Sequence, residues 1–205
     1  MGNPPDRPTG RPTHGLLIGA WLTRPSQRRA ALAALAGAAL TYPEVGASAG
    51  PSPEDAHRAS REVAIGNAPG VFEAAASALL GWRMHRRAGF EVVATTPIAT
   101  VGADMIASLP GRFPVGVSVP TRIIAVVDEP DRAGFTFGTL PGHPVRGEER
   151  FEVRRDADGT VWLSIVAFSR PTPGLVTALG PLMRIGQRLI TDRFVRAVRI
   201  AAAEG

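Results

Sequence analysis

The chain has 205 residues, of which 44% are apolar, so it is long enough for one well-cored domain with an extension. It contains no cysteine, which excludes a disulfide framework, a thiolate metal site and a cysteine nucleophile. The net charge of +5 comes from arginines without any lysine, and because they are scattered along the chain we expect no nucleic-acid interface.

The N-terminal stretch predicts a loosely held arm. Residues 1–15 contain many prolines and glycines without a period, a composition typical of disordered segments. Residues 16–22 are apolar and predict either a short strand or a segment that packs as a clip. The first eight residues, Met-Gly-Asn-Pro-Pro-Asp-Arg-Pro, lack the apolar core of a signal peptide. No apolar run in the sequence is long enough to span a bilayer. We therefore expect a cytoplasmic protein.

A helical extension follows the arm. Ser26 can cap a helix over residues 27–40, which are rich in alanine and leucine. Pro43 ends this helix, since a proline biases the residue before it to an extended conformation. Residues 50–53 have the composition of a linker. The sequence thus predicts an N-terminal arm and helical extension over 1–60 and a second domain over 61–205.

The second domain begins with a short strand over 62–65 and a helical segment over 71–86. This segment has apolar residues at three- and four-residue spacing; Gly81 can divide it, and Gly89 is placed to end it. Six strands separated by turn signals are expected over 90–95, 100–108, 115–128, 133–140, 148–155 and 160–170, with a hairpin turn at 156–159. Prolines then precede a final helix over 181–202.

This element order predicts an α+β architecture, in which an antiparallel sheet carries its helices on one face. The final helix has one apolar side formed by Met183, Gly186, Ile190, Phe194, Ala197 and Ala201. A curved sheet that grips such a helix encloses an apolar space. The arrangement resembles the helix-grip fold of the START/Bet v 1-like (SRPBCC) superfamily, and this resemblance implies that a hydrophobic ligand binds in that space.

A sequence signature supports a second resemblance. Residues 134–151 read Gly-Phe-Thr-Phe-Gly-Thr-Leu-Pro-Gly-His-Pro-Val-Arg-Gly-Glu-Glu-Arg-Phe. Further matching segments lie at 41–46, 82–89 and 167–171, and Gly180-Pro181 followed by Gln187 and Thr191 matches as well. Together they resemble a domain-of-unknown-function family of bacteria and plants. The resemblance implies a fold and the location of a site, but no chemistry.

The signature also contains the candidate catalytic residues, His143 and Glu149. His143 lies between a glycine and a proline in a turn, where its imidazole can act as base, acid or anchor, or can stabilise the turn by bonding a nearby carbonyl. Glu148 and Glu149 are adjacent in a strand and therefore point to opposite faces. If Phe151 points into the interior, Glu149 does so as well, where burial can raise its pKa. The alternative is a structural ion pair at the end of the sheet.

Six further residues are candidates for ligand binding. Arg170 can hold a carboxylate or phosphate of a ligand, or can pair with Glu148 or Glu149. Tyr42 can reach the mouth of the cavity or anchor the extension, and Trp82 can contact a ligand or belong to the core. The apolar candidates are Phe135, Phe137 and Phe151. The four histidines lack metal-binding spacing and no phosphate-cradling motif is present, so we expect neither a metal nor a cofactor.

The last predicted strand is apolar on both of its faces over residues 161–168. A half-exposed antiparallel strand alternates instead. We therefore expect its outer face to be covered, either by the first 60 residues or by a second copy of the chain in a homodimer.

The sequence favours a domain that binds a hydrophobic small molecule in an internal cavity. The alternative is an enzyme that uses the same cavity for acid/base chemistry such as cyclisation, dehydration or isomerisation, with Glu149 or His143 moving a proton. A purely structural or interaction protein is the third interpretation.

Overall fold

The computed structural model describes residues 25–109, 117–172 and 180–204. The predicted arm and the apolar run at 16–22 lie outside these residues. In chain order the elements are α1 (Pro25–Ala34), the 3-10 helix η1 (Ala47–Ala49), β1 (His57–Gly66), α2 (Val71–Leu80), α3 (Arg83–Arg87), β2 (Glu91–Ala94), β3 (Asp104–Leu109), β4 (Val117–Glu129), β5 (Arg132–Thr139), β6 (Val145–Arg155), β7 (Val161–Pro171) and α4 (Gly180–Ala203).

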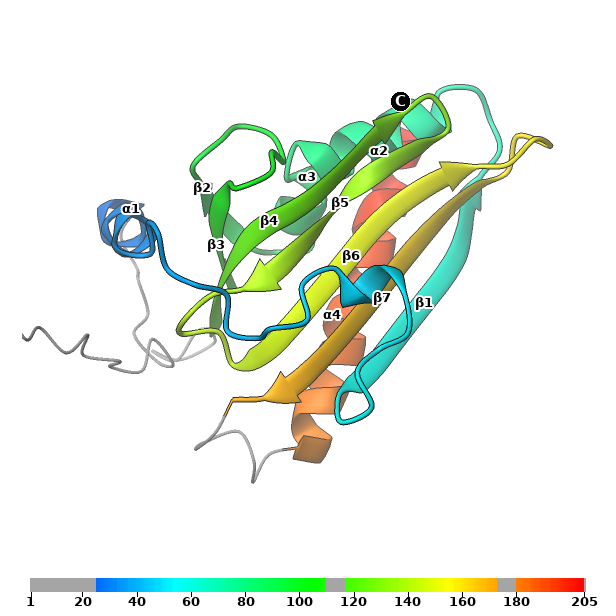
Figure 1. Cartoon of the computed structure of the whole chain (residues 1–205). Coiled ribbons are helices and arrows are strands. Elements are labelled where there is room, and N and C mark those ends of the chain that lie inside the picture. Colours follow the sequence, from blue (N-terminus) through cyan, green and yellow to red (C-terminus); the bar gives the residue numbers. More distant parts are fainter. Residues whose placement is uncertain (1–24, 110–116, 173–179, 205) are drawn as a thin grey trace, which may run out of the picture.

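The seven strands form one antiparallel sheet in the order β1-β7-β6-β5-β4-β3-β2. The strands pair with their neighbours in sequence, except that β1 returns to lie beside β7. The long helix α4 crosses one face of this curved sheet, and the N-terminal segment lies on the other (Figure 1). The predicted α+β, helix-grip arrangement is therefore confirmed.

The helices beside α4 are divided where the sequence predicted. Gly81 is the C-cap of α2, and Trp82 follows in the left-handed conformation, with a φ of 62°. This unusual backbone at a bulky residue lets the indole nitrogen of Trp82 donate a hydrogen bond to the carbonyl oxygen of Thr96, at 3.2 Å. Gly89 has a φ of +95° and follows the end of α3, as expected of a glycine that ends a helix.

The face of the sheet toward α4 is its inner face, which carries the main core. On α4, the predicted inward residues Phe194, Ala197 and Ala201 are buried, while the side chain of Met183 lies outside the described residues. Val195 and Val198 are buried as well, because α2 and α3 pack along a second side of α4. The buried stripe of α4 is therefore wider than its apolar spacing predicts.

The opposite, outer face is covered in part by α1. Leu32 and Leu35 form a second apolar cluster with Ile106 and Leu140. The helix ends at Ala34, earlier than predicted, and Gly37 soon afterwards has a left-handed φ of +74°. Such a glycine turns the chain out of a helix despite the high helix propensity of the alanines around it.

Residues 41–56, which we call the N-terminal clamp, cover another part of the outer face. The ring of Tyr42 packs edge-on against Phe168 of β7, with ring centroids 5.6 Å apart. Figure 1 shows the clamp crossing β6 and β7 on the side away from α4. The expectation that the first 60 residues cover the outer face thus holds where the clamp packs. Strand β1 starts at His57, directly after the clamp, and spans residue 60, where the sequence placed a boundary.

Gly147 allows β6 and β7 to approach each other closely, and we expect its replacement to be severely destabilising. Its φ is +152°, and an added Cβ would lie 2.0 Å from the carbonyl oxygen of Phe168 on the paired strand. Gly147→Ala should reduce the free energy of unfolding by more than about 3 kcal/mol, because the sheet must open to admit the methyl group. Chemical denaturation measures this loss. Gly186→Ala on α4 is the control, since a Cβ there meets nothing within 4 Å; equal stability of the two variants would contradict the expectation.

Candidate functional site

A cavity of about 270 Å³ lies between the inner face of the sheet and α4. Strands β3, β4 and β5 contribute mainly apolar side chains to its wall, and α4 contributes one face. The apolar lining comprises Ala59, Phe90, Met105, Ala107, Leu109, Val117, Val119, Phe137, Pro144, Val145, Ala167, Phe168, Ile190 and Phe194. The polar side chains among the lining residues come mostly from β6, β7, α4 and the turn before β6, so polarity is concentrated on one side of the cavity.

Glu149 reaches this cavity because of its register in the sheet. It pairs with Phe137 on β5 and with Ala167 on β7, and both also line the cavity. Among the described residues, none forms a hydrogen bond or ion pair with its carboxyl group. Burial raises the pKa of Glu149 to about 7, because removal from bulk water disfavours the charged form. Glu149 is therefore an uncompensated acid that titrates near neutral pH.

Glu148, the preceding residue, lies on the outer face and has a structural role. It is 2% exposed and accepts hydrogen bonds from the hydroxyl of Tyr42 at 2.9 Å and from the backbone amides of Gly46 at 2.5 Å and Ser48 at 3.0 Å. Three donors of the N-terminal clamp thus converge on one carboxylate. The predicted division of the two glutamates between opposite faces agrees with this geometry.

Tyr42 lies in this outer-face contact and is absent from the cavity lining. Burial and the neighbouring Glu148 carboxylate raise the pKa of its phenol above the ordinary value, so the hydroxyl remains a donor. Gly138 makes room for this hydroxyl, since a Cβ there would lie 2.2 Å from the Tyr42 oxygen. Of the two sequence interpretations of Tyr42, the geometry matches the one in which it anchors the extension.

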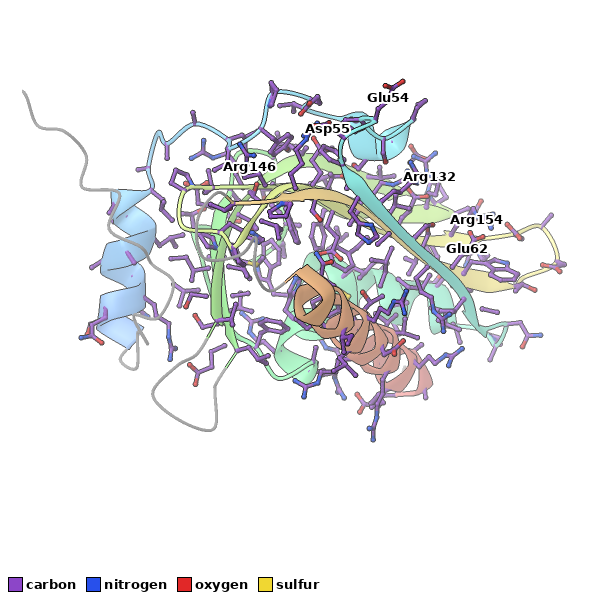
Figure 2. All side chains as sticks on the ribbon, turned by 90° about the horizontal axis from the view of Figure 1, so that it is seen from below. Glu54, Asp55, Glu62, Arg132, Arg146 and Arg154 are labelled. Atoms are coloured by element: carbon purple, nitrogen blue, oxygen red, sulfur yellow. The ribbon has the colours of Figure 1, made fainter. Side chains whose placement is uncertain are left out.

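Arg170 also holds the N-terminal clamp. Its guanidinium donates to both carboxylate oxygens of Glu44, at 2.8 and 3.1 Å, and to both of Asp55. The hydrogen bonds to Asp55, and to a lesser extent those to Glu44, raise the pKa of Arg170 above its ordinary value. The sequence offered two roles for Arg170, holding a ligand or pairing with Glu148 or Glu149. The predicted pairing is wrong because Arg170 bonds to the clamp, and Arg170 is absent from the described lining of the cavity. In Figure 2 the labelled Asp55 lies on the side of the sheet away from α4.

His143 lines the cavity from the turn before β6. Its Nδ1 lies 2.8 Å from the carbonyl oxygen of Val145 and 3.1 Å from the Val145 amide, so the tautomer decides whether it donates to the first or accepts from the second. Burial lowers the pKa of His143 to about 4, and the backbone contact with Val145 opposes this shift only in part. The neutral imidazole therefore stabilises the turn and still borders the cavity.

The predicted aromatic residues divide between the cavity and the core beneath it. Phe137 lines the cavity, whereas Phe135, Phe151 and Trp82 are buried and absent from its lining. Phe135 and Phe151 pack together with a centroid separation of 5.4 Å, and Trp82 lies 5.6 Å from Phe135. These three rings support the wall that carries Phe137 and Glu149.

His85 also lines the cavity, although it was not among the candidate site residues. Its ring stacks on that of Phe135, with centroids 6.0 Å apart and the planes inclined by 30°, and it makes T-shaped contacts with Phe151 and Phe194. Its Nδ1 is buried and has no hydrogen-bond partner among the described residues. Burial first, and then Arg86, lower the pKa of His85 to about 3, so the ring is neutral. A histidine in a helix otherwise rich in apolar and basic residues was the only sequence signal.

Helix α4 contributes two polar lining residues, Gln187 and Thr191, which belong to the segments that resemble the family but were not among the candidate site residues. The side-chain amide of Gln187 lies 3.5 Å from the hydroxyl of Ser169 on β7, and the Thr191 hydroxyl donates to the carbonyl oxygen of Gln187 at 2.9 Å. They follow the predicted inward residues Gly186 and Ile190 by one position each. Their spacing on the helix could therefore have identified them.

The described part of the chain holds no group of three or more histidine, cysteine or acidic side chains able to bind a metal ion. Within the same residues, no helix is both long and apolar enough to cross a membrane.

The sequence is similar to a known protein family and to proteins of other organisms. The sequence matches the family described as domain of unknown function DUF1990 over residues 41–197. A UPF0548 protein of Deinococcus radiodurans is 36% identical over 190 residues, covering 87% of this chain and 95% of that protein. A UPF0548 protein of Arabidopsis thaliana is 28% identical over 132 residues, covering 62% of this chain and 63% of the other.

The fold of this chain is similar to that of several proteins of known structure. Ara h 8.0201 superposes with a TM-score of 0.52 at 12% identity, over 73% of this chain and 99% of the other. A hypothetical protein from Helicobacter pylori superposes with a TM-score of 0.53 at 13% identity, over 77% of this chain and 95% of the other. Major latex-like protein 151 from Panax ginseng superposes with a TM-score of 0.50 at 14% identity, over 71% of this chain and 96% of the other. These likenesses confirm the Bet v 1-like helix-grip fold and extend to the fold alone.

Proposed function

This chain belongs to the DUF1990 family and has a Bet v 1-like helix-grip fold, and we propose that the cavity inside this fold binds a hydrophobic small molecule. The observation that supports the proposal most directly is the cavity itself. Its volume of about 270 Å³ lies just below the range of about 300–1,000 Å³ that is usual for small-molecule sites. A small ligand is therefore expected.

The composition of the cavity wall agrees with such a ligand. Apolar side chains make up most of the lining, and a few polar groups lie together on one side. An apolar wall stabilises a ligand through burial of its hydrocarbon surface, by about 25 cal/mol per Å². The grouped polar residues, Glu149, His143, Gln187 and Thr191, can then orient the ligand.

Gly186 gives a direct way to test the cavity as the binding site. This residue lines the cavity from α4, and a Cβ atom added there meets nothing within 4 Å. Gly186→Leu should fill part of the space and also favour the helix, since leucine has a higher helix propensity than glycine. We expect wild-type protein to bind octan-1-ol saturably, and the variant to bind it at least tenfold more weakly, as measured by amide chemical shifts in NMR titrations.

Ala33→Leu is the matched control for this experiment. It adds the same side chain at an exposed position of α1, on the far side of the sheet from the cavity. Octan-1-ol should bind to this variant as to the wild type. If the alcohol binds with unchanged affinity after Gly186→Leu, or if octan-1-ol, octylamine and octanoate all fail to bind to the wild type, the proposed function is wrong.

An enzyme that uses the same cavity is the second candidate, and the titration of Glu149 favours it. A carboxyl group with a pKa of about 7 can both give and take a proton near neutral pH, as a general acid/base requires. Native mass spectrometry of ligands that co-purify with wild type and Glu149→Gln separates the candidates. A binding protein retains the same molecule in both, whereas an enzyme retains substrate in the variant and product in the wild type.

A further inference from the structure

The charges around the cavity are one-sided. Glu149 supplies the ionisable acid, since the carboxylate of the other lining glutamate, Glu148, is bonded on the outer face. No arginine is among the lining residues that the structure identifies. The two lining histidines, His85 and His143, are neutral because burial lowers their pKa values to about 3 and about 4. The described wall therefore offers a negative charge and no positive charge to balance it.

The nearby arginines are directed elsewhere. Along β6, Arg146, Arg150 and Arg154 alternate with Gly147, Glu149 and Phe151, so they occupy the outer face. Figure 2 shows the labelled Arg146, Arg132 and Arg154 on the side of the sheet away from α4. Arg170 bonds to Glu44 and Asp55 of the N-terminal clamp. The sheet thus separates these positive charges from the cavity.

From this arrangement we infer that the cavity is selective for apolar molecules that carry a basic amine, with Glu149 as the counter-ion of the ammonium group. The inference rests on the proposed function of the cavity. An ammonium group beside Glu149 forms a charge-assisted hydrogen bond in a water-poor site, where such bonds are strong. A carboxylate ligand instead has to lose its hydration beside an acid that offers no positive partner.

The neighbouring polar groups complement an ammonium group. It has three donors and no acceptor. Besides Glu149, the lining offers the carbonyl oxygen of the Gln187 side chain, whose amide nitrogen is directed to Ser169, and the hydroxyl of Thr191, which retains lone pairs while donating to a backbone carbonyl. Acceptors thus predominate on the polar side of the cavity. The apolar lining from β3 and β4 is left for a hydrocarbon body.

Binding of an amine is consequently coupled to the ionisation of Glu149. The residues paired with it, Phe137 on β5 and Ala167 on β7, do not titrate, and none of the lining residues that the structure describes on α4 is charged. His85 and His143 remain neutral from pH 6 to pH 8. At pH 6 an ammonium ligand must displace a proton from Glu149, whereas at pH 8 the group is already ionised. The amine should bind about tenfold more tightly at pH 8.

Isothermal titration calorimetry of the full chain with octylamine, octan-1-ol and octanoate tests the inference. At pH 8, we expect octylamine to bind at least tenfold more tightly than octanoate. At pH 6, titrations in two buffers of different ionisation enthalpy should show release of close to one proton per bound octylamine. Glu149→Gln should reduce the preference for octylamine over octanoate to less than threefold and abolish the proton release.

The outcomes distinguish this inference from the function on which it rests. If octan-1-ol binds in the cavity, as judged by its loss in Gly186→Leu, but octanoate binds as tightly as octylamine, only the selectivity for amines is wrong. A preference that persists in Glu149→Gln also overturns it. If none of the three probes binds to the wild type, or all bind unchanged to Gly186→Leu, the cavity is not a binding site and both proposals fail.

Discussion

Glu149→Gln is expected to make the protein more stable at pH 8, by about 2–3 kcal/mol, while changing its stability by less than about 1 kcal/mol at pH 5. Burial raises the pKa of Glu149 from 4.5 to about 7, so the folded state holds its proton more tightly than the unfolded state. The stabilisation that results is fully present below pH 4.5 and is lost as the pH rises to about 7. Above that pH the wild type must bury a carboxylate or protonate it, and glutamine must do neither.

Urea denaturation of wild type and Glu149→Gln at pH 5 and pH 8 measures this difference. Comparison at the same pH cancels the contribution of the histidines, which are identical in both proteins. Equal stabilities at pH 8 would mean that the Glu149 carboxylate is compensated in solution, which removes the basis for treating it as an unpaired charge.

Replacing the preceding glutamate, Glu148, by glutamine should have the opposite effect on stability. Glu148→Gln is expected to lower the free energy of unfolding at pH 8 by about 2–4 kcal/mol, because an amide cannot accept from all three donors that the carboxylate satisfies. The amide nitrogen that replaces one oxygen would face backbone N–H or hydroxyl donors. Buried donors without an acceptor each cost about 1–3 kcal/mol.

Tyr42→Phe separates the contribution of one donor from that of the whole contact. It removes the hydroxyl and leaves the amides of Gly46 and Ser48 bonded, so its cost should be smaller than that of Glu148→Gln. Denaturation of both single variants and of the double variant gives the coupling between the two side chains. Additive effects would show that the hydroxyl and the carboxylate do not interact in solution.

Alternation along β6 was the feature that sequence reasoning used most successfully. Because side chains alternate with a period of two, an inward Phe151 requires an inward Glu149 and an outward Glu148, and the register shows this arrangement. The succession of strands and helices along the chain, the division of the helix at Gly81 and the covering of the outer face also follow from local signals in the sequence. These features depend on a few neighbouring residues, so the sequence suffices for them.

Long-range partners could not be predicted in the same way. Arg170 bonds to Glu44 and Asp55, more than a hundred positions away, and several acidic residues were equally plausible partners before the path of the clamp was known. His85 lines the cavity because α3 is short and packs against α4, a tertiary arrangement that has no local signature. The size and position of the cavity depend on such packing as well.

The N-terminal clamp has a consequence for the smallest part of this protein that can fold autonomously. A chain shortened to start at His57 keeps the sheet and α4 but loses every donor that Glu148 has in the clamp, and both carboxylates that Arg170 holds. Phe168 would lose its contact with Tyr42. A shortened chain that keeps these contacts has to begin upstream of the first strand, near residue 41, where the match to the family also begins.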